Sequence, residues 1–227
     1  MDKNVRILAI NPGSTSTKIA VYQNEKVVFL KTIRHSPEEL AKFPRITDQY
    51  QYRKEKIHQE LKDADIYFDL IRAVIGRGGL VKPIASGVYR VNEAMRQDLL
   101  ACKMGEHASN LGALIADDIA KELPNAIALI ADPVVVDEFE PLARYSGHPA
   151  FERVSIFHAL NQKAIARSHA KSIMRQYEDM NLIVVHLGGG ITVGAHRKGR
   201  VIDVNQGLDG DGPFSPERSG GLPSGAL

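Results

Sequence analysis

The chain has 227 residues, 44% of them hydrophobic and 25% charged, which is enough for one large or two modest hydrophobic cores. Its 29 Lys and Arg residues against 27 Asp and Glu give a formal net charge of +2, which argues against a general nucleic-acid binder. A single cysteine, Cys102, excludes a disulfide framework and a thiolate zinc cluster. No apolar run approaches the roughly 20 residues of a membrane span, and the N-terminus lacks a signal-peptide pattern, so we expect a soluble, cytoplasmic protein.

The first thirty residues predict three strands joined by short turns. Apolar runs rich in branched residues occupy 5–10, 19–22 and 27–30, separated by a turn at Asn11-Pro12-Gly13-Ser14 and by a polar turn at 23–25. Because the connections are this short, the pattern indicates an antiparallel meander and not the strand–helix–strand start of a nucleotide-binding unit.

A helix is predicted to begin after Ser36, which is followed by Pro37 in the first turn and by the capping-box acid Glu39. Apolar residues then recur on one side as far as Tyr50, and we expect Pro44 to kink this helix.

Further elements follow in the first part of the chain. A short strand at 73–75 leads into Gly76-Arg77-Gly78-Gly79, and Asn92 can cap a helix that carries Met95, Leu99 and Leu100. Apolar spacing predicts a helix over 108–123, and a buried strand over 126–131 ends at Asp132-Pro133.

A domain boundary is expected near 145–155, giving a first domain of residues 1–152 and the beginning of a second at 153–227. The second part predicts one long helix over 157–177 and strands at 181–190, 191–195 and 201–204. Residues 7–15 and 184–192 share a form, an apolar strand that turns through small residues into another strand. This repetition predicts two related α/β domains.

Two turns of small residues, 11–17 and 188–192, could hold phosphate oxygens through backbone N–H groups and short hydroxyls. The alternative interpretation is that each is an ordinary hairpin turn. The first turn lacks the second P-loop glycine, the second has Val193 at the last glycine position of the dinucleotide fingerprint, and both lead into strands. We therefore exclude a P-loop and a Rossmann motif.

Four other residues are candidates for chemistry. Arg77 and Arg218 lie in glycine-rich stretches and could clamp an anion, although each could also be a solvated surface arginine. Asp132, at the end of a strand, could hold Mg²⁺ through water or simply form a turn before proline. His158 could cap its helix, lie in the core or donate to a phosphate, and the spacing does not choose between these roles.

The assembled motifs resemble those of the butyrate kinases in the acetokinase family, within the acetate and sugar kinase/Hsp70/actin superfamily. The resemblance covers essentially the whole chain. It rests on residues 10–18, 105–112, 132–138, 155–162, 186–190 and 209–220.

This resemblance implies a fold of duplicated ribonuclease H-like α/β domains, each a mixed sheet with a three-strand antiparallel meander flanked by helices. It also implies reversible, Mg²⁺-dependent transfer of a phosphoryl group from ATP to a short-chain fatty acid, giving an acyl phosphate and ADP, in a cleft between two domains. Butyrate or a branched analogue is the expected acid, with acetate or propionate as the alternative.

By position, the resemblance also assigns roles to residues of this chain. Arg77 and Arg218 match the arginines near the transferred phosphoryl group, His158 a phosphate-contacting histidine, and Asn11 and Asp132 the residues near Mg²⁺. The two phosphate loops match the residues Asn11, Gly13, Ser14, Thr15 and Ser16, and His186, Gly188, Gly189 and Gly190. A carboxylate substrate is already a nucleophile at neutral pH, so the reaction needs no dedicated base.

The relatives continue beyond the position that matches Leu227, so the second domain is expected to be incomplete and the chain alone to turn over little substrate. A homo-oligomer is also expected. Two other functions compete with the kinase: a non-catalytic binder of nucleotide or acyl phosphate with the same fold, and an assembly protein of the actin type. The second of these gives Arg77, His158 and Arg218 no role.

Overall fold

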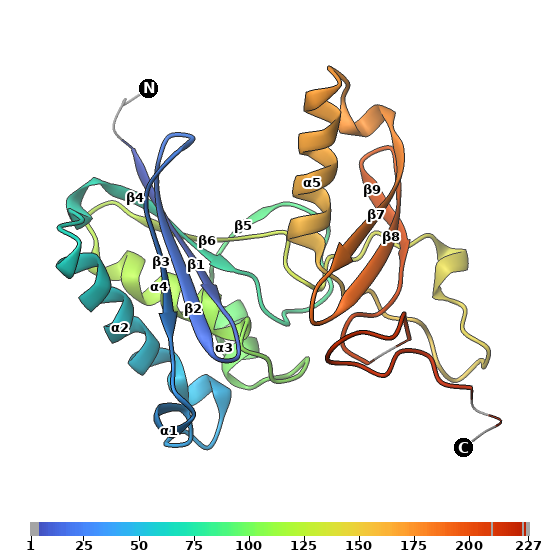
Figure 1. The fold of residues 1–227 in the computed structure, drawn as a ribbon, viewed down its shortest axis with the longest axis horizontal. Coiled ribbons are helices and arrows are strands. Elements are labelled where there is room, and N and C mark those ends of the chain that lie inside the picture. The colour runs from blue at the N-terminus through green and yellow to red at the C-terminus, as the bar shows by residue number, and fades with distance from the viewer. Residues whose placement is uncertain (1–4, 210, 224, 226–227) are drawn as a thin grey trace. The chain divides into compact units, whose positions relative to one another are not determined.

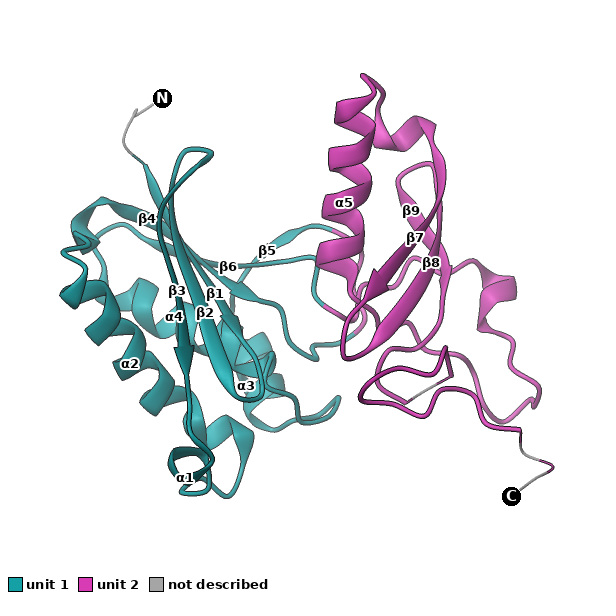
Figure 2. Ribbon diagram, in the orientation of Figure 1, with its two compact units in different colours: residues 1–82, 87–133 teal, residues 83–86, 134–227 magenta. Residues whose placement is uncertain are grey.

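A computed structural model describes residues 5–209, 211–223 and 225. Figure 1 shows the order of the elements along the chain. The chain divides into two compact units, residues 1–82 with 87–133 and residues 83–86 with 134–227, which Figure 2 shows in different colours. Each unit is described by itself.

The first unit is built on a mixed sheet of six strands in the order β3-β2-β1-β4-β6-β5. The strands are β1 (Arg6–Pro12), β2 (Ser16–Gln23), β3 (Lys26–Arg34), β4 (Ile71–Arg77), β5 (Val88–Arg90) and β6 (Ile127–Ala131). β1, β2 and β3 pair antiparallel, as the short turns predicted, whereas β4 and β6 run parallel to β1. The carboxyl ends of β1, β4 and β6 therefore share one edge of the sheet.

Helices α2 (Tyr50–Asp63), α3 (Glu93–Leu100) and α4 (Asn110–Glu122) belong to this unit. α4 carries the predicted apolar stripe, with Leu111, Leu114 and Ile115 fully buried, and packs against β1, β4 and β6. The predicted cap of α3 is confirmed, since the side chain of Asn92 accepts a hydrogen bond from the Met95 N–H at 2.9 Å.

The helix expected to run from Ser36 past Pro44 was predicted wrongly. The capping box forms as expected, but helix α1 covers only Pro37–Leu40, and the chain continues through a 3-10 turn at Ile46–Gln49 into α2. Proline lacks an N–H and disfavours helical geometry in the residue before it, so Pro44 ends the helix where a kink was expected. The short strand β5, paired with β6, was not predicted at all.

The second unit contains a sheet of three antiparallel strands, β7 (Asn181–Leu187), β8 (Ile191–Arg197) and β9 (Arg200–Val204), and helix α5 (Ala159–Ser172). This meander has the same consecutive pairing as β1–β2–β3, which agrees with the repetition seen in the sequence. α5 packs on β7, and Ala166, Ala170, Tyr177 and Met180 bury a small core with Leu182 and Val184.

Helix α5 ends earlier than the predicted residue 177. Met174 takes a left-handed φ of 54°, and the Arg175 N–H donates to the Ala170 carbonyl at 2.9 Å while the Met174 N–H donates to the Lys171 carbonyl at 3.1 Å. This pair of hydrogen bonds is a Schellman motif, which terminates a helix. Such an ending usually carries glycine, so the sequence contained no sign of it.

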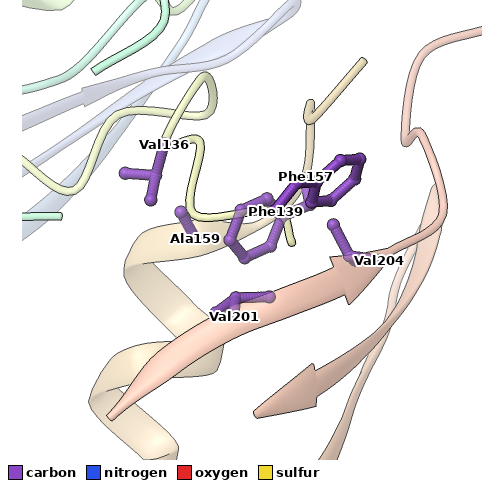
Figure 3. Packing of buried hydrophobic residues seen from close by; sticks show 6 residues of the cluster. All are labelled: Val136, Phe139, Phe157, Ala159, Val201 and Val204. Atoms are coloured by element: carbon purple, nitrogen blue, oxygen red, sulfur yellow. The ribbon is translucent and has the colours of Figure 1, made fainter. Parts of the chain in front are cut away.

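Residues 134–152, which the sequence analysis placed with the first domain, pack with the second unit. Val136 and Phe139 join Phe157, Ala159, Val201 and Val204 in one buried apolar cluster (Figure 3). The Glu140 N–H also donates to the Ile202 carbonyl at 3.1 Å. This apolar burial explains why the units divide at Pro133–Val134 and not near residue 152.

Candidate functional site

In the turn between β1 and β2, the backbone carbonyl oxygens accept hydrogen bonds from other groups of the protein. The Gly13 N–H donates to the Ser16 carbonyl at 2.7 Å, and the Thr15 carbonyl accepts from the His35 N–H at 2.9 Å. Ser14 and Thr15 are exposed. Their short hydroxyls are therefore available to a ligand, as the phosphate-loop prediction requires.

A buried arginine that the sequence analysis did not single out holds this turn from behind. Arg53 on α2 is 1% exposed, and its guanidinium donates to the carbonyl oxygens of Gly13 at 2.8 Å, Ser14 at 3.1 Å and Ser16 at 3.2 Å. Burial lowers its pKa to about 10, which still leaves it cationic at neutral pH. A fixed positive charge behind the turn favours an anion in front of it.

One signal in the sequence could have identified Arg53. Gln49, Arg53, Ile57 and Leu61 recur every four residues and form the buried stripe of α2 and the turn before it. A charged residue at an apolar position of such a stripe needs buried oxygen partners. The Gln49 side chain supplies one of them, at 3.1 and 2.8 Å from two guanidinium nitrogens.

Three predicted site residues lie in a row at the carboxyl edge of the parallel strands. The register pairs Ile10 with Gly76 and Arg77 with Ala131, so Asn11, Arg77 and Asp132 follow one another across β1, β4 and β6. Arg77 Nη1 donates to Asn11 Oδ1 at 3.4 Å, and burial lowers the pKa of Arg77. The structure thus brings together residues that are 121 positions apart in the sequence (11 to 132).

Asp132 is buried and tightly tied to the loop before β5. Its Oδ1 accepts from the Gly87 N–H at 2.9 Å, and its own N–H donates to the Gly87 carbonyl at 2.9 Å. The residue takes a left-handed φ of 36°, a conformation that Asp tolerates better than most residues. Asp132 thus extends the pairing of β6 with the segment before β5, and its carboxylate is held at the strand end.

The residues at this edge fit Mg²⁺ only as part of a shared coordination shell. Among the described residues, no three His, Cys, Asp or Glu side chains gather where they could hold a metal ion. Mg²⁺ is usually bound by one or two carboxylates, with water and substrate phosphates completing the shell. One carboxylate from Asp132 and one amide oxygen from Asn11 suit an ion that arrives with a nucleotide.

The second unit carries two stacked histidines. His158 and His186 lie face to face, with ring centroids 3.6 Å apart and planes 5° from parallel. His158 Nδ1 lies 2.9 Å from Thr192 Oγ1, and His186 Nδ1 lies 2.9 Å from the Asn161 amide. His158 occupies the N-cap position of α5, but within the described residues its side chain makes no capping hydrogen bond. Its role as a helix cap is excluded.

The glycine turn after β7 is packed by the loop that contains Arg218. The Gly189 carbonyl accepts from the Ser215 hydroxyl at 2.8 Å and from the Glu217 N–H at 3.1 Å. The Arg218 guanidinium lies directly against the Cα of Gly190, where a side chain would overlap it. Arg218 is thus a half-buried residue that packs against the predicted second phosphate loop.

The predicted site residues therefore form two groups, one in each unit. The first unit contains Asn11, Arg77 and Asp132 together with the turn at Gly13, Ser14, Thr15 and Ser16. His158, His186 and Arg218 stand with Gly188, Gly189 and Gly190 in the second. Each group combines a glycine-containing turn with at least one cationic or hydrogen-bond-donating side chain, which is the composition of an anion site.

Comparison with known proteins confirms the resemblance drawn from the sequence. Residues 151–225 match the model of the acetokinase family. Butyrate kinase 1 and Butyrate kinase 2 of Clostridium acetobutylicum are 59% and 57% identical to this chain over 222 residues, which are 98% of the chain and 62% of each relative. The chain thus spans less than two thirds of the length of these relatives.

A solved structure confirms the expected fold class. The acetate kinase of Porphyromonas gingivalis superposes with a TM-score of 0.72 at 16% identity, covering 98% of this chain and 62% of that one. Both units of the chain therefore have the α/β fold of an acetate kinase. No helix in the part of the chain that the structure describes has the length and apolar character needed to cross a membrane.

Proposed function

We propose that this chain is all or part of a carboxylate kinase, an enzyme that transfers a phosphoryl group from ATP to a short-chain fatty acid. The observation that carries the proposal is the 59% identity to Butyrate kinase 1 over 98% of the chain. The two groups of site residues support it, since each provides the donors and positive charge that a phosphoryl group requires.

The proposed step is an in-line displacement. A carboxylate oxygen of the acid attacks the γ-phosphorus of ATP, and the bond from that phosphorus to the oxygen shared with the β-phosphate breaks. The products are an acyl phosphate and ADP, and no proton needs to be moved because the carboxylate is ionised at neutral pH. The same step run backwards makes ATP from the acyl phosphate.

The chain's residues would act mainly by positioning and by neutralising charge. In the first unit, the turn backed by Arg53 binds phosphate oxygens and Arg77 contacts the transferred group. In the second, His158, His186, the glycine turn and Arg218 contact phosphate oxygens. Mg²⁺, held by Asp132 and Asn11 together with the nucleotide, would neutralise phosphate charge.

Butyrate is the proposed acid, and branched acids of similar size such as isobutyrate should also be accepted. The names of the two relatives support this choice. A pocket shaped for the longer chain gains about 1–3 kcal/mol for each methylene, so kcat/KM for butyrate should clearly exceed that for acetate. Equal values would favour an acetate or propionate kinase. A homo-oligomeric state and a cytoplasmic location stay predictions of the resemblance.

Formation of hydroxamate from the acid, ATP and hydroxylamine tests the proposal, because hydroxylamine traps acyl phosphates. A protein that spans the full length of the butyrate kinases should give ATP-dependent hydroxamate, whereas the 227-residue chain by itself, which spans 62% of those relatives, should give little. Nucleotide binding without product would support the non-catalytic alternative, and filament formation on ATP would support an assembly protein.

Substitution of the two arginines tests the site. Arg77→Ala and Arg218→Ala should each lower kcat on the order of 10²–10⁴-fold with little change in the KM for ATP. Arg72→Ala is the matched control for Arg77, because Arg72 lies at the opposite end of β4 and donates to backbone carbonyls there. Near-normal kcat in both test variants would remove the phosphoryl contact from the proposal.

A further inference from the structure

Five side chains of the second unit form one continuous chain of hydrogen bonds that ends at His158. Tyr177 Oη lies 2.7 Å from His196 Nδ1, and His196 Nε2 lies 2.9 Å from Gln162 Oε1. Gln162 Nε2 lies 2.9 Å from Thr192 Oγ1, and that hydroxyl lies 2.9 Å from His158 Nδ1. The middle three residues are buried.

The direction of these hydrogen bonds follows from one backbone group. Gln162 Nε2 also lies 3.0 Å from the carbonyl oxygen of Thr192, and a carbonyl can only accept. The amide nitrogen of Gln162 must therefore face Thr192, where its two protons reach the carbonyl and the hydroxyl. The amide oxygen is left to face His196, and so it accepts a hydrogen bond from the N–H at His196 Nε2.

His196 agrees with this direction. Burial, followed by the positive charge of Lys163, lowers its pKa to about 4, so the ring is neutral at neutral pH. A neutral imidazole with its proton on Nε2 has a bare Nδ1. That nitrogen accepts a hydrogen bond from the Tyr177 hydroxyl. Both ring nitrogens of His196 therefore have a hydrogen-bond partner.

The donor and acceptor roles at Gln162 also determine those at Thr192 and His158. Because Thr192 Oγ1 accepts a hydrogen bond from the Gln162 amide, its own O–H is available to donate to His158 Nδ1. If Nδ1 carried a proton instead, two donors would point at the buried Thr192 oxygen, and the hydroxyl proton would lose its acceptor. A buried donor left unpaired is destabilising, so this arrangement is disfavoured.

We propose that Gln162 and Thr192 are positioning residues that hold His158 as the tautomer with a bare Nδ1 and its proton on Nε2. His158 Nε2 is then a fixed hydrogen-bond donor. The further step, that this donor meets a phosphoryl oxygen, rests on the proposed function. The stacked His186 ring restricts rotation of His158 and keeps the donor in one direction.

Long-range ¹H–¹⁵N correlation spectra of the ¹⁵N-histidine-labelled protein test the tautomer directly. The His158 signals are assigned by their loss in His158→Gln. At about pH 7.5, where an ordinary histidine is mostly neutral, His158 should show a protonated Nε2 and an Nδ1 shifted by an accepted hydrogen bond. An Nδ1–H tautomer, or a ring protonated on both nitrogens, would overturn the proposal.

Two matched substitutions at Thr192 test the source of that hydrogen bond. Thr192→Ser keeps the hydroxyl and should preserve the Nδ1 signal, whereas Thr192→Val has the same shape without a donor and should lose the shift. An unchanged Nδ1 signal in Thr192→Val would contradict the proposal. Gln162→Glu can only accept, so it should draw the Thr192 proton away from His158 and move the His158 proton to Nδ1.

Kinetics then separate the tautomer from the proposed activity. Thr192→Val should lower kcat about 10-fold, which corresponds to about 1.4 kcal/mol, with a smaller change in the KM for ATP, and Thr192→Ser should restore it. If the spectra show the Nε2–H tautomer but no acyl phosphate forms, the proposed function fails and the tautomer assignment stands. If product forms while Thr192→Val leaves the spectrum and kcat unchanged, the proposed function stands and the tautomer assignment fails.

Discussion

The guanidinium of Arg53 donates a 2.8 Å hydrogen bond to the carbonyl oxygen of Gly13, across 40 residues of sequence. The same guanidinium contacts the carbonyls of Ser14 and Ser16, so α2 determines the shape of the turn between β1 and β2. A turn rich in Gly, Ser and Thr has many accessible conformations in isolation. Here a side chain from a distant helix selects one of them.

Arg53→Met should therefore destabilise the protein and weaken nucleotide binding. The substitution keeps an unbranched side chain but orphans partly buried carbonyls, at about 1–3 kcal/mol for each group left without a partner. Urea unfolding and calorimetric titration with ATP measure the two effects. Arg53→Lys should be nearly as harmful, because one ammonium cannot reach three carbonyls in the way that a planar guanidinium does.

Lys62→Met is the matched control for Arg53→Met, since Lys62 is an exposed residue of the same helix. Its unfolding midpoint and ATP affinity should stay close to those of the unsubstituted protein. Equal behaviour of the two methionine variants would show that the turn does not depend on Arg53.

The elements that the sequence predicted well are those whose signals are local. Short apolar runs and turn residues predicted both meanders, and the Asn92 cap and the stripe of α4 needed only neighbouring residues. The failures arise where a single residue overrides the periodicity. Pro44 ends a helix that periodicity continued, and Met174 takes a conformation that favours glycine.

In the candidate site, too, local sequence signals predicted some features and not others. The alignment of Asn11, Arg77 and Asp132 follows from the parallel register of three strands, which spacing along the chain does not reveal. Sequence alone could list three roles for His158, and the contact with Thr192 removes one of them. Arg53 was missed although its place in the buried stripe with Ile57 and Leu61 distinguishes it from a surface residue; its carbonyl partners, about 40 positions away, are not visible in the sequence.

Gly190→Ala should separate activity from stability. A Cβ at this position would overlap the Arg218 guanidinium, which is the mobile end of a long side chain and can move aside. We expect the unfolding midpoint to change little and kcat to fall on the order of 10²-fold, because Arg218 is displaced from its seat on the turn. Gly147→Ala is the control, since a Cβ there meets no atom within 4 Å. A variant with normal kcat would show that the position of Arg218 against Gly190 is not needed for turnover.

Acidification should destabilise the fold through two buried histidines. Burial lowers the pKa of both His35 and His196 to about 4, against an ordinary value of 6.5. Between these values the unfolded chain binds protons that the folded chain does not, so stability falls as the pH drops through that window. The urea midpoint should therefore decrease from about pH 7.5 to about pH 5.5, a range in which ordinary carboxylates stay ionised.

His196→Gln tests the source of this pH dependence. Glutamine keeps a hydrogen-bonding side chain but does not titrate, so the variant should lose part of the decrease in the urea midpoint between the two pH values. His148→Gln serves as the control, because His148 is exposed and its replacement should leave the slope unchanged. A His196→Gln slope identical to that of the unsubstituted protein would assign the pH dependence to other groups.

Gly112→Ala should give the opposite result to Gly190→Ala, because here the obstacle is backbone. Gly112 lies on α4 where the helix meets β4, and a Cβ would overlap the carbonyl oxygen of Arg77. Helix propensity alone predicts that alanine stabilises the helix interior by about 1 kcal/mol. Overpacking against a rigid strand costs typically 1–3 kcal/mol and sometimes more, so the net effect should be a loss of stability. The displaced strand end also carries Arg77, so kcat should fall together with the unfolding midpoint.

Gly87→Ala is the matched control, since its Cβ would lie at an ordinary 3.5 Å from the Tyr89 ring. A Gly112→Ala variant as stable as the unsubstituted protein would show that α4 can shift away from β4 at no cost, and that the close approach of helix and strand is not what positions Arg77.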